Sequence, residues 1–259
     1  MGEHDHLFNQ DPNADSAGVP WAGRAFEANP FADDDGSADA NLIGELSKLR
    51  AGDGSVEGVV DAFRSARLLV PLLANLGDAE MGAHGQVVDK SADLAIVTVE
   101  TPDQQDGLPV FSSVESMKAW NETARPVPVD ARKAALAAAQ EGNTRIILDP
   151  GSATEFVIRR PAIAAIAQSL PWLHPVKDER VQAAFAEATS GINEILGFEL
   201  KDIDPQSVLA AAEVQLELRL VSGLDREQLD EIMQRLAKAL AASHDIAEYV
   251  DSLRVKLAS

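Results

Sequence analysis

The sequence predicts an α+β protein, in which a mixed-sheet α+β domain precedes a ferredoxin-like (βαββαβ) domain. Three observations lead to this fold class. Apolar residues alternate with polar ones in some stretches and recur every three or four residues in others, which are the periods of strands and helices. Cap and turn residues separate these stretches at short intervals. A proline-punctuated joint at residues 169–177 divides the pattern into two parts.

Residues 1–40 are predicted to form an acidic, mostly disordered tail. They show no apolar period and hold nine acidic residues against Arg24 alone. Such a segment cannot bury enough apolar surface to offset the entropy lost on ordering. Trp21 and Arg24 stand in an aromatic island, so we expect them to contact a groove of the protein itself or of a partner.

Residues 41–169 are predicted to form the first domain. The expected helices are 42–49, 55–63, 113–120, 131–141 and 161–168, and the expected strands are 68–74, 93–100, 108–111, 145–148 and 155–158. Ser55, Ser113 and Asp130 are the types of residue that cap helix N-termini. Asp149-Pro150-Gly151 is a strong turn signal between the last two strands.

Residues 170–259 are predicted to form the second domain. Its expected elements are a helix at 178–190, strands at 192–200 and 213–221, a helix after Asp225 and a strand at 253–257. Asp225 and Gln228 make a capping box for the second helix. A short strand at Trp172–Val176 would complete the ferredoxin-like order.

Composition excludes several classes of function. The chain has 22 basic and 42 acidic residues, a net charge of −20, which disfavours binding to nucleic acid or to a membrane surface. It has no cysteine, which fits a cytoplasmic location. The longest apolar run, Leu68–Leu76, is too short to span a bilayer.

The chain shows no catalytic motif. None of the five histidines stands in a zinc-binding pattern, and no nucleophile elbow or phosphate-binding glycine loop follows a predicted strand. We therefore predict no catalytic residue, no metal site and no cofactor.

Two polar groups remain as candidate binding residues. Asp89, Lys90 and Ser91 enter a predicted strand, where they form either a solvated strand end or the polar rim of a groove. Arg159 and Arg160 are the densest basic pair in the acidic chain. Arg159 either pairs with Glu155 or Asp149 or receives an anionic group of a ligand.

Six stretches of this sequence resemble actinobacterial members of the SseB family. They are Val19–Arg24, Asp89–Ala95, Leu108–Ser113, Asp149–Ala162 and the Gly223–Asp225 and Asp251–Leu253 segments of the C-terminal region. The resemblance implies an SseB-like N-terminal domain followed by an SseB C-terminal region. The family name refers to enhanced serine sensitivity, and the resemblance implies no particular activity and no catalytic residue.

The sequence favours a non-enzymatic module that binds a ligand or a protein, either as a monomer or as a homodimer formed through the C-terminal sheet. The alternative is an enzyme with a site around Asp89, Lys90, Ser91 and Arg159. A third hypothesis is an adaptor that engages a protein partner through its aromatic tail. The identity of a small-molecule ligand is left open.

Overall fold

The computed structural model describes residues 31–74 and 94–258. Residues 36–259 belong to one compact unit, and residues 1–35 are a separate unit. The predicted α+β class is confirmed, since the described residues form eight α-helices and three β-sheets.

The elements lie in the following order along the chain. The α-helices are α1 (Ala40–Ala51), α2 (Val56–Ser65), α3 (Val114–Trp120), α4 (Ala131–Gln140), α5 (Arg160–Ala167), α6 (Glu179–Ser190), α7 (Arg226–Ala242) and α8 (His244–Tyr249). The strands are β1 (Arg67–Ala74), β2 (Leu94–Ile96), β3 (Val99–Glu100), β4 (Asp106–Val110), β5 (Arg125–Asp130), β6 (Arg145–Leu148), β7 (Phe156–Arg159), β8 (Ile195–Asp202), β9 (Val214–Leu220) and β10 (Leu253–Leu257). A 3-10 helix, η1, covers Pro175–Lys177.

The first hydrophobic core lies between two sheets and four helices. One sheet has the order β2-β1-β5 and the other the order β3-β4-β6-β7, and Leu69 of β1 bridges to Phe111 just after β4. Helices α1, α2, α4 and α5 bury their apolar sides against inward residues of β1, β4, β6 and β7. This core uses Leu, Val, Ile and Ala with few aromatic rings, as the composition predicts.

The predicted helix starts are confirmed where a capping side chain is present. Ser55, Ser113, Asp130 and Asp225 each accept a hydrogen bond from a backbone amide of the first helical turn. At α7 the capping box is complete, because the Gln228 side chain accepts from the Asp225 amide. Each cap satisfies donors that a helix start leaves without partners.

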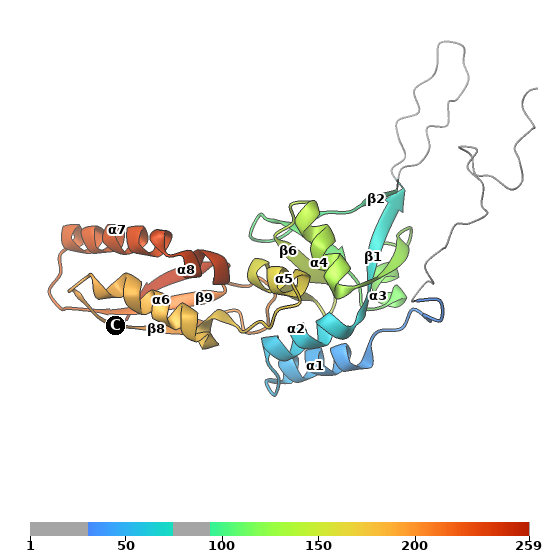
Figure 1. Cartoon of the computed structure of the whole chain (residues 1–259), viewed down its shortest axis with the longest axis horizontal. Coiled ribbons are helices and arrows are strands. Elements are labelled where there is room, and N and C mark those ends of the chain that lie inside the picture. The colour runs from blue at the N-terminus through green and yellow to red at the C-terminus, as the bar shows by residue number, and fades with distance from the viewer. Residues whose placement is uncertain (1–30, 75–93, 259) are drawn as a thin grey trace, which may run out of the picture. The chain divides into compact units, whose positions relative to one another are not determined.

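The second hydrophobic core is built from a three-stranded sheet with α6, α7 and α8 (Figure 1). In this sheet β9 is central, antiparallel to β8 and parallel to β10. Val214, Leu216 and Leu218 of β9 are buried in the core, while Glu217 and Arg219 alternate onto the other face. The alternation that predicted this strand is therefore confirmed.

The predicted strand at Trp172–Val176 is wrong, and the described C-terminal sheet lacks the fourth strand of a βαββαβ domain. The chain instead forms η1, with His174 as its N-cap and Pro175 in its first turn. Proline has no amide to donate to a neighbouring strand, and both Pro171 and Pro175 interrupt this stretch. The Trp172 side chain packs against the first core.

The predicted strand at 93–100 is interrupted. Residues 94–96 form β2 beside β1, whereas residues 99–100 form β3 beside β4 in the other sheet. The predicted hairpin between β3 and β4 is confirmed, as is the one between β6 and β7. The two main cores use residues 42–166 and 181–250, and the domain boundary at 169/170 stays a prediction.

Candidate functional site

Most of the predicted binding residues lie outside the described residues. Trp21 and Arg24 precede residue 31, and Asp89, Lys90 and Ser91 fall within residues 75–93. Their role in binding stays a prediction. The alternative enzyme site also stays a prediction, because it requires the side chains of Asp89, Lys90 and Ser91 to lie beside Arg159.

Arg159 lies at the end of β7 and is buried between the two cores. Its Nη2 atom lies 2.5 Å from Asp204 Oδ2, and its Nη1 atom lies 3.2 Å from Asp251 Oδ2. Neither Glu155 nor Asp149 is its ion-pair partner. Both terminal nitrogens of Arg159 are therefore engaged by carboxylates from the C-terminal part of the compact unit.

A second arginine completes this group, which we call the arginine cluster: Asp103, Arg145, Arg159, Asp204 and Asp251. Arg145 Nη1 donates to Asp251 Oδ1 at 2.7 Å, and Arg145 Nη2 donates to Asp103 Oδ2 at 2.8 Å. Both arginine side chains are 5% exposed, and Asp251, 3% exposed, contacts both of them. Burial raises the pKa of Asp103, but hydrogen bonds from Thr101 and Arg145 outweigh it and lower the pKa overall.

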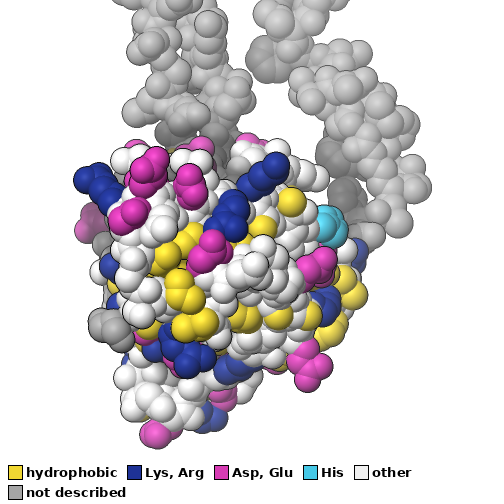
Figure 2. All heavy atoms as spheres, turned by 90° about the vertical axis from the view of Figure 1, so that its left-hand side faces the viewer, with side chains coloured by type: hydrophobic (Ala, Val, Ile, Leu, Met, Phe, Trp, Pro, Cys, Tyr) yellow, Lys and Arg dark blue, Asp and Glu magenta, His cyan; other side chains and the backbone are white. Residues whose placement is uncertain are grey.

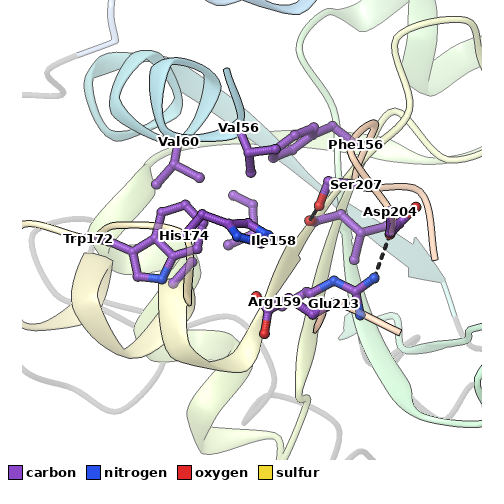
Figure 3. A pocket seen from close by; sticks show the side chains of 12 residues that line it. Val56, Val60, Phe156, Ile158, Arg159, Trp172, His174, Asp204, Ser207 and Glu213 are labelled. Carbon is purple, nitrogen blue, oxygen red and sulfur yellow. Dashed lines mark hydrogen bonds and ion pairs between the residues drawn. The ribbon is translucent and has the colours of Figure 1, made fainter. Parts of the chain in front are cut away.

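Glu213 is a further buried carboxylate beside the arginine cluster (Figure 3). Its Oε2 atom accepts the backbone amide of Asp251 at 2.7 Å. Burial raises the pKa of Glu213 to about 7, despite the opposing effect of that hydrogen bond and of Arg159. The cavity next to it has a volume of about 10 Å³, the lower limit for one water molecule. This region is therefore suited to holding the two cores together and too small for an organic ligand.

Arg160 contacts the last turn of α8. Its Nη2 atom donates to the backbone carbonyls of Ala247 at 2.7 Å and Val250 at 3.3 Å. Carbonyls at a helix C-terminus lack partners within the helix, and a cation there is favourable. The basic pair thus has two different sets of contacts, with Arg159 inside the arginine cluster and Arg160 joining α5 to α8.

A groove of about 220 Å³ lies between α5, the connection after it, and the facing ends of α6 and α8. We call it the α5–α8 groove. Most of its lining residues are apolar or aromatic, yet polar and apolar atoms contribute about equally to its surface. Its polar side chains stand at the start of α6, at the end of α8 and on Gln168. The lining residues are Pro161, Ala164, Ala165, Gln168, Leu170, Pro171, Trp172, Leu173, Asp178, Arg180, Glu248 and Tyr249.

Local backbone geometry creates one wall of the groove. Ser169, the residue after the C-cap of α5, has a φ of +58°, and the amide of Leu170 donates to the carbonyl of Ala165 at 2.8 Å. This is the hydrogen bond of a Schellman motif, in which glycine is the usual left-handed residue. The turn leaves Leu170 and Leu173 51% and 53% exposed beside the half-buried Trp172.

The charged side chains of the groove are partly neutralised. Arg180 donates to Asp178 at 3.1 and 2.6 Å, which lowers the pKa of Asp178 and raises that of Arg180. The Arg180 guanidinium also lies 4.1 Å from the centre of the Tyr249 ring, a cation–π distance. A hydrogen bond with Glu248 raises the pKa of the Tyr249 hydroxyl.

Two backbone amides at the groove are not used by the fold. Within the described residues, no hydrogen bond is donated by the amides of Trp172 and Leu173. Their neighbours differ, because the amide of Leu170 is bonded to Ala165 and that of His174 lies 3.4 Å from Glu57.

Other exposed apolar side chains are dispersed. Figure 2 faces the end of the molecule formed by the C-terminal sheet and its helices, where hydrophobic side chains lie among charged ones of both signs. Leu196, 64% exposed on β8, is the most exposed large apolar side chain of the described residues. Scattered apolar exposure of this kind is ordinary on a protein surface.

Sequence reasoning missed the α5–α8 groove. Its walls come from residues 161–180 and 248–249, and no local pattern indicates that these segments meet. One signal was present. Leu170, Trp172 and Leu173 place three large apolar residues around Pro171, but we interpreted this stretch as part of the joint between the domains and Trp172–Val176 as a short strand.

The described residues contain no group of three His, Asp or Glu side chains that could hold a metal ion. In the same part of the chain, no helix is long and apolar enough to cross a membrane.

Comparison with known families supports the predicted resemblance. Residues 43–165 match the SseB protein N-terminal domain. The SseB match covers α1 to most of α5, together with both sheets of the first core. It therefore includes Arg145, Arg159 and Arg160, whereas Asp204, Asp251 and α8 lie beyond it. No curated protein and no solved structure matches the chain.

Proposed function

We propose that this protein is a non-enzymatic, SseB-like binding protein whose ligand occupies the α5–α8 groove. One observation carries the proposal: the groove combines a volume of about 220 Å³ with lining residues that are mostly apolar or aromatic and with a few polar side chains among them. Ligand sites in proteins have this composition, although most are larger.

The environment of the groove suits binding better than catalysis. The Asp178 carboxylate is engaged by Arg180, which holds it in the ionised form, and Tyr249 has its pKa raised rather than lowered. None of these shifts produces a nucleophile or a base poised near neutral pH. The two unused amides of Trp172 and Leu173 offer hydrogen-bond donors to a ligand.

We also propose that the resemblance to the SseB family extends over the C-terminal region, since the Gly223–Asp225 and Asp251–Leu253 segments resemble that region of the family. A cytoplasmic location, the actinobacterial type of the family and a homodimer remain predictions from the sequence.

The proposal is tested with a library of small apolar fragments that includes indole and N-acetyl-leucine amide. Backbone amide resonances are followed by NMR in the wild-type protein, in Ala164→Trp, which fills the groove, and in Ala186→Trp. Ala164 and Ala186 are both exposed helical alanines, and Ala186 lies on α6 outside the groove lining.

We expect fragments to shift the amides of residues 164–173 and 248–250 in the wild type and in Ala186→Trp. The shifts should be lost in Ala164→Trp. If no fragment shifts these amides, or if Ala164→Trp responds like the wild type, the groove is not the binding site and the proposal is wrong.

A further inference from the structure

We infer that the occupant of the α5–α8 groove is a peptide segment of a partner protein that inserts one or two large apolar side chains and carries a Lys or Arg beside them. The inference rests on the proposed function and adds the chemical class of the ligand. Three features of the groove lead to it: its size, its unused backbone donors and its charge.

The size of the groove favours side chains over a whole organic ligand. Sites for drug-sized molecules span roughly 300–1,000 Å³, whereas this groove has about 220 Å³. The small side chains of Ala164 and Ala165 line the hollow together with Trp172 and Tyr249 and leave room for an inserted side chain. The exposed side chains of Leu170 and Leu173 extend the apolar surface beyond the hollow, so a longer ligand would bury more of it.

The unused donors favour a ligand with a backbone. The amides of Trp172 and Leu173 have no acceptor within the described residues, and both residues belong to the groove lining. Peptides that bind beside an irregular or strand-like segment gain affinity from main-chain hydrogen bonds and specificity from side-chain pockets. Carbonyl groups of a bound peptide could accept from these two amides while its apolar side chain fills the hollow.

The charge of the groove favours a basic flank. Arg180 is neutralised by Asp178, which leaves Glu248 as the remaining charged group of the lining. Glu248 is 48% exposed, and its ion-pair partner His244 is charged only when protonated. Asp245 on the same helix is exposed as well. With a chain charge of −20, the surrounding field also attracts cationic partners.

A phage library of random dodecapeptides provides the test. It is selected on the wild-type protein at 0.15 M salt, with parallel selections on Ala164→Trp and Ala186→Trp. We expect the wild type and Ala186→Trp to enrich peptides with a Leu, Ile, Met, Phe or Trp next to a Lys or Arg. Ala164→Trp should enrich none of them.

The charge preference is then measured with one selected peptide and its twin in which Gln replaces the basic residue. Glu248→Gln should weaken binding of the basic peptide about twofold to fivefold, the range for one exposed ion pair, and leave binding of the twin unchanged. Glu231→Gln, on the exposed side of α7, should change neither affinity.

The other outcomes separate this inference from the proposed function. Enrichment of apolar peptides with no basic preference, or an unchanged affinity in Glu248→Gln, contradicts the inference while the groove remains a binding site. Fragment binding without any enriched peptide assigns the groove to small molecules. A dimer that Ala164→Trp dissociates assigns it to a second copy of the chain. Each of these last two results also overturns the inference.

Discussion

Replacing Arg159 by methionine should destabilise the protein by about 3 kcal/mol, toward the lower end of the range for breaking a buried ion pair. The side chains of Arg159, Asp204 and Asp251 are 5%, 2% and 3% exposed, so the stranded carboxylates cannot be rehydrated without opening the structure. Methionine retains much of the apolar stem. The loss therefore reflects charge and hydrogen bonding more than packing.

The lower end of the range applies because both carboxylates keep other partners. Asp204 still accepts the backbone amides of Leu209, at 2.9 Å, and of Val208 and Ala210, each at 3.3 Å. Asp251 still pairs with Arg145 at 2.7 Å. Removing the charge of Asp204 as well should recover part of the loss, so Arg159→Met with Asp204→Asn should be at least about 1 kcal/mol more stable than the two single effects combined.

Urea unfolding followed by far-UV circular dichroism and by tryptophan fluorescence measures both quantities. All three tryptophans lie at or before residue 172, so fluorescence reports on the first part of the chain and dichroism on all helices. Arg125→Met is the control, because Arg125 is exposed on β5 and makes no ion pair within the described residues. It should change stability by no more than about 0.5 kcal/mol. A change below 1 kcal/mol in Arg159→Met, or simple additivity in the double variant, would refute the reasoning.

Three further predictions concern other buried or capping groups. Glu213→Gln should stabilise the protein by about 3 kcal/mol above pH 7 and have little effect below pH 4.5, because burial raises the pKa of Glu213 in the folded state from 4.5 to about 7. The wild type should therefore lose stability relative to this variant as the pH rises from 4.5 to 7. Parallel pH profiles of the two proteins would contradict the assignment. Arg160→Ala should speed hydrogen exchange in α8 severalfold, since its guanidinium is bonded to the last carbonyls of that helix, while exchange in α7 serves as the internal control. Asp149→Ala should lower the free energy of unfolding in urea by about 3 kcal/mol, because the buried carboxylate accepts hydrogen bonds from Ser112, Ser116 and Thr154. Asp149→Asn should lower it less, because asparagine tolerates the φ of +46° and keeps one oxygen acceptor. Equal losses in the two variants would show that the hydrogen bonds are not the cause.

The features that could be predicted from sequence are those determined by neighbouring residues. An N-cap acts within three residues, so Ser55, Ser113, Asp130 and Asp225 were identifiable from their place before an apolar period. Strand alternation in 214–220 separates the apolar side chains from the polar ones and was equally clear, although Gln215 on the polar face is buried as well.

The same kind of reasoning failed where tertiary packing decides. Residues 172–176 have an apolar-rich pattern that fits a strand, but the ring of Trp172 packs on the first core and Pro175 begins a 3-10 helix. The partners of Arg159 lie 45 and 92 residues away. Local spacing instead suggested Glu155 and Asp149, the nearest carboxylates along the chain.

The candidate site could be anticipated only in part. Arg159 and Arg160 stood out because basic pairs are rare in this acidic chain, yet the first is buried in the arginine cluster and the second holds α8. The groove joins α5 to a helix more than 80 residues later. Its polar residues were not distinctive in the sequence, since Asp178 and Glu248 look like ordinary surface acids.

The position of Asp251 along the chain has a consequence for the order of assembly during synthesis. Residues 36–169 emerge from the ribosome with Arg145 and Arg159 already in place on β6 and β7, but the carboxylate that contacts both follows about 90 residues later. Until then, two guanidinium groups destined for burial must remain hydrated or find temporary partners. We therefore expect the nascent first core to stay loosely closed along β6 and β7, and to reach its full protection only when the last strand is added.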